Sequence, residues 1–192
     1  MSNPSFVPNK QRFRSRILLL CAFMLLLAAC SAKPAKDGAE AAIYKAYPDL
    51  KGRPVTLTEV KRVVDGDTFE TAAGEKVRLI GVNTPETVKP GSPIQPYGKQ
   101  ASAFTKGKLT GQSVYLFADT GDKDKYGRLL RYVFIRGESV MFNETLMREG
   151  YANTMTIQPN VMFQDLFRKA EKEAREAKRG LWGDPESAAK KK

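Results

Sequence analysis

The sequence predicts an α+β chain, mainly β, in which a five-stranded OB-fold barrel is capped by about three helices. Two observations carry this prediction. Short stretches of β-branched and apolar residues recur between turns that contain glycine. Three further stretches repeat their apolar residues at helical spacing, interrupting or following the predicted strands. An open α+β sandwich is the alternative arrangement of the same elements.

The first three predicted strands form a meander, because tight turns separate them. Asp65-Gly66 supplies the first turn and Ala73-Gly74-Glu75 the second. Two more strands follow later in the chain, the last of them directly after Arg128. The expected strands are residues 55–64, 69–71, 76–82, 113–117 and 129–135.

The three predicted helices follow from apolar stripes and from glycines that stop them. Gly111 follows the first stripe, and Gly150 supplies a left-handed cap for the second. The third stripe is rich in Phe, Leu and Ala, and Leu181-Trp182 is expected to pin its end to the core. The expected helices are residues 97–109, 141–149 and 160–179.

The N-terminal 29 residues are expected to be an export signal. Residues 1–16 are polar and basic, and residues 17–29 form an apolar run too short to span a bilayer as a mature helix. The run ends in Leu27-Ala28-Ala29-Cys30, which resembles the lipobox of bacterial lipoproteins. Cleavage before Cys30 and lipidation of its thiol would anchor the protein in the cell envelope, with the folded domain outside the cytoplasm. An ordinary secreted protein or an uncleaved anchor is the alternative.

Composition divides the remaining chain into three parts. Residues 30–54 are rich in Ala, Lys, Gly and Pro, which predicts a flexible tether with some helix near residues 40–47. Residues 55–184 hold the predicted domain, and residues 185–192 form a basic tail.

Charge and the missing residue types narrow the chemistry. The net charge is +11, which suits an anionic partner such as a nucleic acid or a membrane surface, although a basic surface can also serve solubility alone. The chain has no histidine, and its two cysteines are Cys21, in the signal, and Cys30. Histidine catalysis, thiolate nucleophiles and zinc sites built from His or Cys are therefore excluded.

One segment, residues 77–86, combines the functional groups that remain. Arg78 stands on the predicted strand, and its planar fork suits phosphate oxygens. Asn83 and the Thr84 carbonyl are oxygen donors suited to Ca²⁺ or Mg²⁺, and Glu86 can accept a proton from water. By itself the segment could be only a strand entering a turn at Pro85.

Two other segments add what this one lacks. Asp65 and Asp67 end the strand that precedes it, and residues 124–128 read Asp-Lys-Tyr-Gly-Arg before the last strand. The three segments, in this order, resemble the staphylococcal nuclease (thermonuclease) family. The likeness covers about residues 55–182 and includes Tyr97-Gly98 and the stretch 101–106 on the first domain helix.

The resemblance implies a Ca²⁺-dependent phosphodiesterase on an OB barrel that hydrolyses DNA or RNA, and a monomer is expected. Carried over by motif, the calcium ligands would be Asp67, Asn83 and the Thr84 carbonyl, with Asp65 behind them. The catalytic residues would be Arg78 and Arg128 on the scissile phosphate, and Glu86 as the proposed general base. Lys125 and Tyr126 would lie near the terminal phosphate of the bound nucleotide.

The chain departs from the family pattern at two places. Asn83 stands where the best-known members have an aspartate ligand, and residues 153–158 lack the tyrosines that stack on the bound base. A non-catalytic nucleic-acid-binding OB-fold lipoprotein is the alternative function, but binding alone has no need of Glu86 beside Arg78 and Arg128. A surface adhesin or envelope scaffold has no positive support in the sequence.

Overall fold

The structure, a computed structural model, describes residues 38–87 and 95–183 and contains a closed barrel of five strands. The strand order is β1-β2-β3-β6-β5, with β3 and β6 parallel and the other neighbours antiparallel. The predicted five-stranded barrel is confirmed, and the open sandwich is not formed. The barrel strands are β1 (Val55–Asp65), β2 (Thr68–Thr71), β3 (Lys76–Leu79), β5 (Ser113–Phe117) and β6 (Leu129–Ile135).

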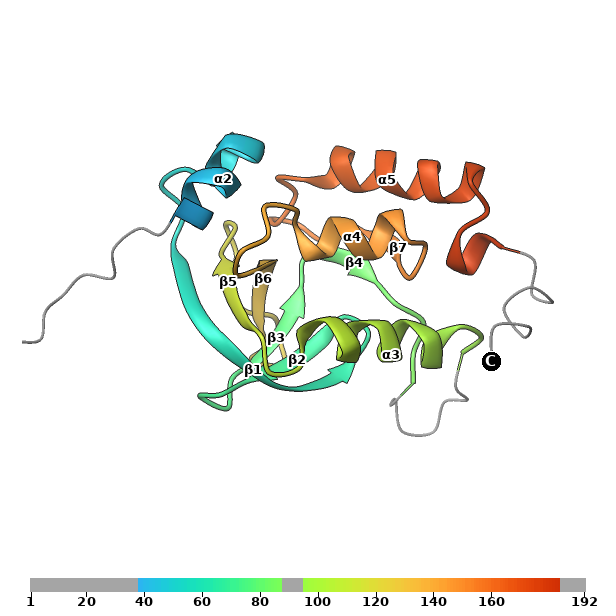
Figure 1. The fold of residues 1–192 in the computed structure, drawn as a ribbon, viewed down its shortest axis with the longest axis horizontal. Helices are drawn as coiled ribbons and strands as arrows, with labels where there is room; N and C mark the ends of the chain where they lie inside the picture. Colours follow the sequence, from blue (N-terminus) through green and yellow to red (C-terminus); the bar gives the residue numbers. More distant parts are fainter. Residues whose placement is uncertain (1–37, 88–94, 184–192) are drawn as a thin grey trace, which may run out of the picture. The chain divides into compact units, whose positions relative to one another are not determined.

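Helices cover the barrel, and Figure 1 shows α4 and α5 running side by side. The helical elements are α2 (Gly38–Ala46), η1 (Pro48–Leu50), α3 (Gly98–Leu109), α4 (Phe142–Arg148), α5 (Gln164–Glu176) and η2 (Gly180–Trp182). None of the helices in the described ranges is both long and apolar enough to cross a membrane. Helix α5 begins at Gln164 rather than at the predicted Asn160. The Asn160 side chain is instead bonded to the backbone of Gly121: its Oδ1 accepts from the Gly121 N–H (2.6 Å), and its Nδ2 donates to the Gly121 carbonyl (3.0 Å).

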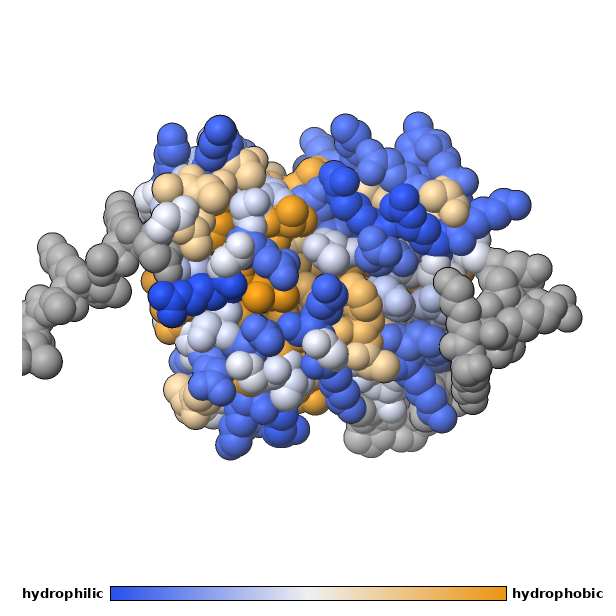
Figure 2. Space-filling view, in the orientation of Figure 1, coloured by the Kyte–Doolittle hydropathy of each residue, from blue (hydrophilic) through white to orange (hydrophobic). Residues whose placement is uncertain are grey.

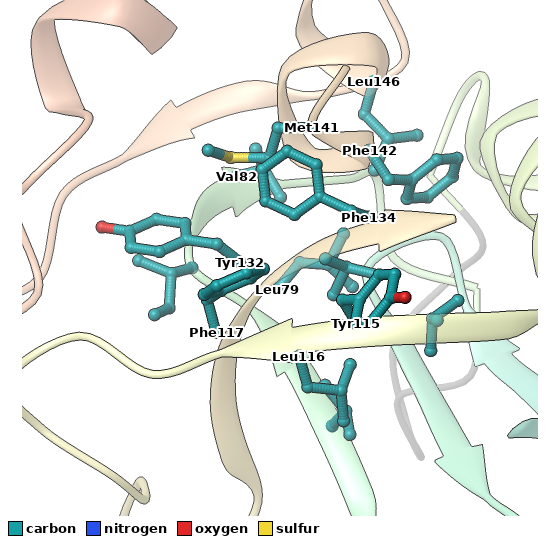
Figure 3. Close-up of a cluster of buried hydrophobic side chains, with 14 of the residues drawn as sticks. Leu79, Val82, Tyr115, Leu116, Phe117, Tyr132, Phe134, Met141, Phe142 and Leu146 are labelled. Carbon is teal, nitrogen blue, oxygen red and sulfur yellow. The ribbon is translucent and has the colours of Figure 1, made fainter. Parts of the chain in front are cut away.

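The hydrophobic core lies between the barrel and α4. Figure 3 shows Phe134 of β6 packed beneath Met141 and Leu146, and all three side chains are fully buried. Tyr132 and Phe117 extend the same cluster along β6 and β5. Residues 114–117 of β5 and 132–135 of β6 are all buried, so these two strands are covered on both faces.

The predicted strand 76–82 is broken in the structure at Ile80. Its second part becomes β4 (Gly81–Asn83), which leaves the barrel and pairs with β7 (Asn153–Met155), a strand that the sequence analysis did not predict. The break depends on Gly81, which has φ +79°, and an added Cβ there would lie 2.3 Å from the Phe167 ring. A residue with a side chain would therefore be strained by its backbone and would also collide with α5.

The parallel pairing of β3 with β6 aligns the two arginine-bearing segments. Arg78 pairs in register with Leu130, so Arg128 lies in the preceding loop, two residues before the partner of Arg78. The pairing thus brings both arginines to one cleft, which their side chains line.

The N-terminal part of the domain differs from the expected tether. Residues 38–50 fold onto the barrel, with Ile43 and Leu50 both 0% exposed and the Tyr47 hydroxyl donating to Glu144 Oε2 at 2.6 Å. The compact unit therefore begins at Gly38 and not at residue 55. The three buried apolar residues of this segment are widely spaced among small residues and lysines, so the sequence pattern did not indicate that the segment packs on the domain. The predicted signal, Cys30 and the basic tail lie outside the described residues.

Hydrophilic side chains cover most of the face drawn in Figure 2, with apolar atoms showing between them. This surface accords with a chain of net charge +11. A basic surface favours approach of a polyanion over distances of a Debye length or less.

Replacement of a buried residue of α2 tests whether this helix belongs to the fold. We expect Ile43→Ala to lower the free energy of unfolding by about 2–5 kcal/mol, because a fully buried side chain leaves a cavity. Urea unfolding at pH 7 measures it. The matched control is Lys45→Ala, an exposed position of the same helix, which should change stability by less than about 0.5 kcal/mol. A segment that acts only as a tether would leave both variants as stable as the wild type.

Candidate active site

The Arg78 side chain is held at the end of β3 by two backbone carbonyls. Its Nη1 donates to the carbonyl of Leu79 at 2.6 Å and to that of Val82 at 2.7 Å. Only 11% of the side chain is exposed, and this burial lowers the pKa of the guanidinium, an effect opposed by the nearby Asp67 carboxylate. Since arginine remains charged in proteins, the site contains a fixed positive charge.

Asp67 is the buried carboxylate that neutralises this charge. Its Oδ2 lies 3.2 Å from Arg78 Nη2 and accepts hydrogen bonds from the Thr84 N–H (3.0 Å) and hydroxyl (3.1 Å). Its Oδ1 accepts from the Thr68 hydroxyl at 3.0 Å. Gly66 permits this packing, because a Cβ at Gly66 would lie 2.7 Å from the Thr84 side chain.

Asn83 completes a group of oxygen donors around one nitrogen. Its Oδ1 lies 3.4 Å from the same Arg78 Nη2 that contacts Asp67. Two of the three predicted metal ligands therefore face a common positive atom, and Thr84, the third, is bonded directly to Asp67. Carboxylate, amide and carbonyl oxygens are the ligands that Ca²⁺ takes, so the donor set fits a hard cation by its chemistry.

This donor set is poor in negative charge. Within the part of the chain that the structure describes, no three or more His, Cys, Asp or Glu side chains are grouped so as to hold a metal ion. On β4 the negative charge is low because Asn83 contributes a neutral amide where an aspartate would contribute a carboxylate. Any cation held here would depend on mixed neutral and charged oxygens.

Glu86 lies beside a second buried carboxylate, Asp65. Burial raises the pKa of Asp65, hydrogen bonds from the Thr87 hydroxyl (2.6 Å) and the Gly66 N–H (2.8 Å) oppose the shift, and a hydrogen bond with the Glu86 carboxyl adds to it. The Glu86 backbone is fixed on the far side by Gln95, which exchanges two hydrogen bonds with it at 3.0 Å. Glu86 is therefore positioned both through its carboxyl and through its main chain.

Arg128 is oriented by the loop that precedes β6. Its Nε donates to Asp124 Oδ2 at 2.7 Å, and Asp124 Oδ1 accepts from the N–H groups of Tyr126 and Arg128. Burial raises the pKa of Asp124, but these hydrogen bonds and the charge of Arg128 outweigh it, and the pKa lies below its ordinary value. Among the described residues, neither Nη of Arg128 has a hydrogen-bond partner, so both remain able to bind an anion.

The two arginines line one cleft of about 570 Å³. Lys125 and Tyr126 form part of the same wall, with Tyr126 72% exposed and its ring centroid 5.1 Å from Lys125 Nζ and 5.5 Å from Arg128 Cζ. These distances permit cation–π contacts that hold the loop side chains together. Lys123 also lines the cleft, which is therefore bordered by four positively charged side chains.

The predicted site residues therefore fall into two groups that meet at Arg78. The cleft is lined by Arg78, Lys125, Tyr126 and Arg128. The oxygen cluster comprises Asp67, Asn83 and Thr84, which contact Arg78 or one another, and Glu86, which reaches the cluster through Asp65. Glu86 is not among the residues that line the cleft.

Sequence reasoning missed the apolar part of the cleft lining. Met155, on β7, and Ile157 belong to it, with 39% and 58% of their surfaces exposed. The lack of tyrosines in this segment is visible in the sequence, but its position depends on the pairing of Met155 with Gly81. An alternation of polar and apolar residues over 153–158 was the available signal for this extended segment.

Comparisons with known proteins agree with the geometry of this site. A family model described as "Staphylococcal nuclease homologue" matches residues 76–184. The chain is 46% identical to the thermonuclease of Staphylococcus hyicus over 129 residues, which is 66% of this chain and 75% of the relative. It is 48% identical to the thermonuclease of Staphylococcus intermedius over 141 residues, 72% of this chain and 81% of the relative. It is 44% identical to endonuclease YncB of Bacillus subtilis over 126 residues, 63% of this chain and 59% of the relative.

Proposed function

The chain belongs to the staphylococcal nuclease family and is a nuclease, and we propose that it is a calcium-dependent enzyme that hydrolyses phosphodiester bonds of DNA or RNA at the cleft between Arg78 and Arg128. The observation that carries the mechanism is that both guanidinium groups line one cleft while Arg78 also contacts an oxygen cluster. A binding module would need the positive wall, but not the carboxylates beside it.

The arginines supply the charge that a phosphodiester requires. A scissile phosphate is anionic, and negative charge accumulates on its equatorial oxygens as water attacks. Arg78 is fixed by Leu79 and Val82, so it need not reorganise during the reaction. Arg128 offers the Nη atoms that Asp124 leaves without a hydrogen bond among the described residues. Together the two guanidinium groups would grip the phosphate from two sides.

Glu86 is the residue proposed to take a proton from the attacking water. With no histidine in the chain, a carboxylate is the available base near this phosphate position. The contact with Asp65 and the backbone bonds with Gln95 restrict how Glu86 can turn. Asp65 therefore acts through the orientation of Glu86, without contacting the substrate itself.

The oxygen cluster is the proposed calcium site. Asp67, Asn83 and the Thr84 carbonyl would hold the ion, and a bound divalent cation supplies Lewis-acid stabilisation to the phosphate oxygens and to water. The support for this assignment is that the Asp67 and Asn83 oxygens already converge on one cationic atom. The low charge of the set favours weak binding of the ion.

The rest of the cleft would receive the nucleotide. Lys125 and Tyr126 are placed to contact a phosphate next to the scissile one, since they share the wall with Arg128. Tyr126, Met155 and Ile157 give exposed apolar surface on which a base can rest without the stacking tyrosines of the family. The enzyme is proposed to act as a monomer.

The enzyme is also proposed to be a lipoprotein, anchored through Cys30 in the cell envelope. The support is the sequence Leu27-Ala28-Ala29-Cys30 after a basic and then an apolar stretch. All four residues lie outside the described ranges.

Substitution of the three proposed catalytic residues tests the mechanism. We expect Arg78→Lys and Arg128→Lys to lower kcat/KM by roughly 10²-fold, because lysine keeps the charge but loses the fork. Glu86→Gln should cost about 10²–10⁴-fold if Glu86 is the base. Initial rates on single- and double-stranded DNA and RNA, with calcium and with a chelator, measure both effects.

The matched controls are Arg62→Lys and Glu70→Gln, an ion pair on the barrel that does not line the cleft. Both should retain near-wild-type rates. Near-wild-type turnover in Arg78→Lys, Arg128→Lys and Glu86→Gln alike would contradict the proposed mechanism.

Asn83→Asp tests the calcium site. Restoring a carboxylate should lower the calcium concentration for half-maximal cleavage by about tenfold or more, since unit charges ~4 Å apart interact by about 4 kcal/mol at an effective dielectric of 20. The control is Asn153→Asp, which adds the same charge at the cross-strand partner of Asn83. Equal shifts in both variants would indicate a general field effect, and an unchanged or higher midpoint in Asn83→Asp would rule out Asn83 as a ligand.

Cys30→Ala tests the anchor. The variant should lose lipid incorporation and move from the membrane fraction to the soluble fraction, because acyl chains contribute about 0.8 kcal/mol per buried CH₂. Mass analysis of the mature N-terminus and fractionation measure the change. Wild-type protein recovered from the medium without lipid would show that the lipoprotein assignment is wrong.

A further inference from the structure

A methionine sulfur lies against the arginine on which the cleft depends. Met155 Sδ is 3.7 Å from Arg78 Nη2, at the limit of a weak hydrogen bond to a thioether. Two contacts fix its position. Met155 pairs in register with Gly81, and the neighbouring Thr154 N–H donates to Glu171 Oε2 of α5 at 3.0 Å.

Met155 is also the methionine most open to solvent in residues 38–87 and 95–183. It is 39% exposed, whereas Met141 and Met147 are 0% exposed and Met162 is partly buried against the core. Thioethers that reach solvent are oxidised by peroxides to sulfoxides, and reductases can reverse the reaction. Accessibility therefore singles out Met155 from the other described methionines.

We propose that Met155 is an oxidation site at which peroxides control the nuclease, an inference that rests on the proposed role of Arg78 in binding phosphate. The sulfur lone pair attacks one oxygen of hydrogen peroxide, an S–O bond forms, and the O–O bond breaks. Sulfur loses two electrons, and the departing oxygen gains them and a proton and leaves as water. Methionine becomes methionine sulfoxide without any further reactant.

The oxygen added in this reaction competes for Arg78. Arg78 Nη1 is already occupied by the Leu79 and Val82 carbonyls, and Nη2 faces Asp67, Asn83 and Met155, so an incoming phosphate must compete for the edge that contains Nη2. A thioether is a weak acceptor, but a sulfoxide oxygen is a strong one, and the sulfur that would bear it lies 3.7 Å from Nη2. Oxidised Met155 would therefore hold Arg78 in a bond that the phosphate has to displace.

The expected loss of activity corresponds to one hydrogen bond to the charged Arg78, for which the sulfoxide oxygen and the phosphate compete. Such a bond changes an equilibrium by about tenfold. We therefore expect sulfoxide formation at Met155 to lower kcat/KM about tenfold while the protein remains folded. The partial exposure of Met155 means that the added oxygen needs no space in the core.

The experiment treats the full-length protein with graded hydrogen peroxide and follows three readouts: peptide mass for sulfoxide, thermal unfolding, and kcat/KM on single-stranded DNA with calcium. The variants are Met155→Leu, which removes the sulfur at similar volume, and Met162→Leu as the matched control. Met155→Gln places an amide oxygen acceptor near Arg78 without any oxidant. Each rate is expressed relative to the untreated sample of the same variant.

The expected result is sulfoxide at Met155 before Met162, with a tenfold loss of kcat/KM in wild type and Met162→Leu, no loss in Met155→Leu, and recovery with methionine sulfoxide reductase. Untreated Met155→Gln should be slower than untreated Met155→Leu. Full sulfoxide at Met155 with unchanged kcat/KM, or equal loss in Met155→Leu, would overturn the inference. Untreated wild type that cleaves no nucleic acid would instead refute the proposed function, and the order of sulfoxide formation would still decide whether Met155 is the reactive site.

Discussion

The interaction on which the site depends is the binding of the Arg78 guanidinium by the Leu79 and Val82 carbonyls and by Asp67. A guanidinium that is 11% exposed would be costly to bury without such partners, because an unpaired charge in a protein interior loses its hydration. The carbonyls are available only because the chain breaks at Ile80 and turns at Gly81. The positive charge that Arg78 brings to the cleft therefore depends on the backbone geometry of β3 and β4.

The same constraint organises the oxygen cluster. Asp67 neutralises Arg78 on one side, and Thr84 fixes Asp67 through both its N–H and its hydroxyl. Gly66 lets the two turns approach, and Asn83 follows directly on β4. Removal of the Asp67 carboxylate would take this acceptor from the Thr84 N–H and hydroxyl and the counter-charge from Arg78, which is more costly than the loss of a single hydrogen bond.

The barrel, and the segments that carry the candidate site residues, could be predicted from sequence because their signals are local. Residues 65–67, 77–86 and 124–128 each carry several polar groups at a strand end, and their order identified the family. The α2 segment could not be predicted as part of the domain, because its anchors Ile43 and Leu50 are spaced among small and charged residues. The position of β7 was equally hidden, since three residues gain strand geometry only from pairing with β4.

The parallel pairing of β3 with β6 also determines when the cleft can exist. The meander of β1, β2 and β3 joins residues that are close in sequence, whereas Val77 and Leu129 must meet across the intervening β4, α3 and β5. Closing so long a segment loses more chain entropy than forming a hairpin, so such contacts form slowly in barrels of this kind. The two arginines therefore come together only as the barrel closes. A chain in which β3 and β6 have not yet paired does not hold the two arginines together, so it cannot grip a phosphate from both sides.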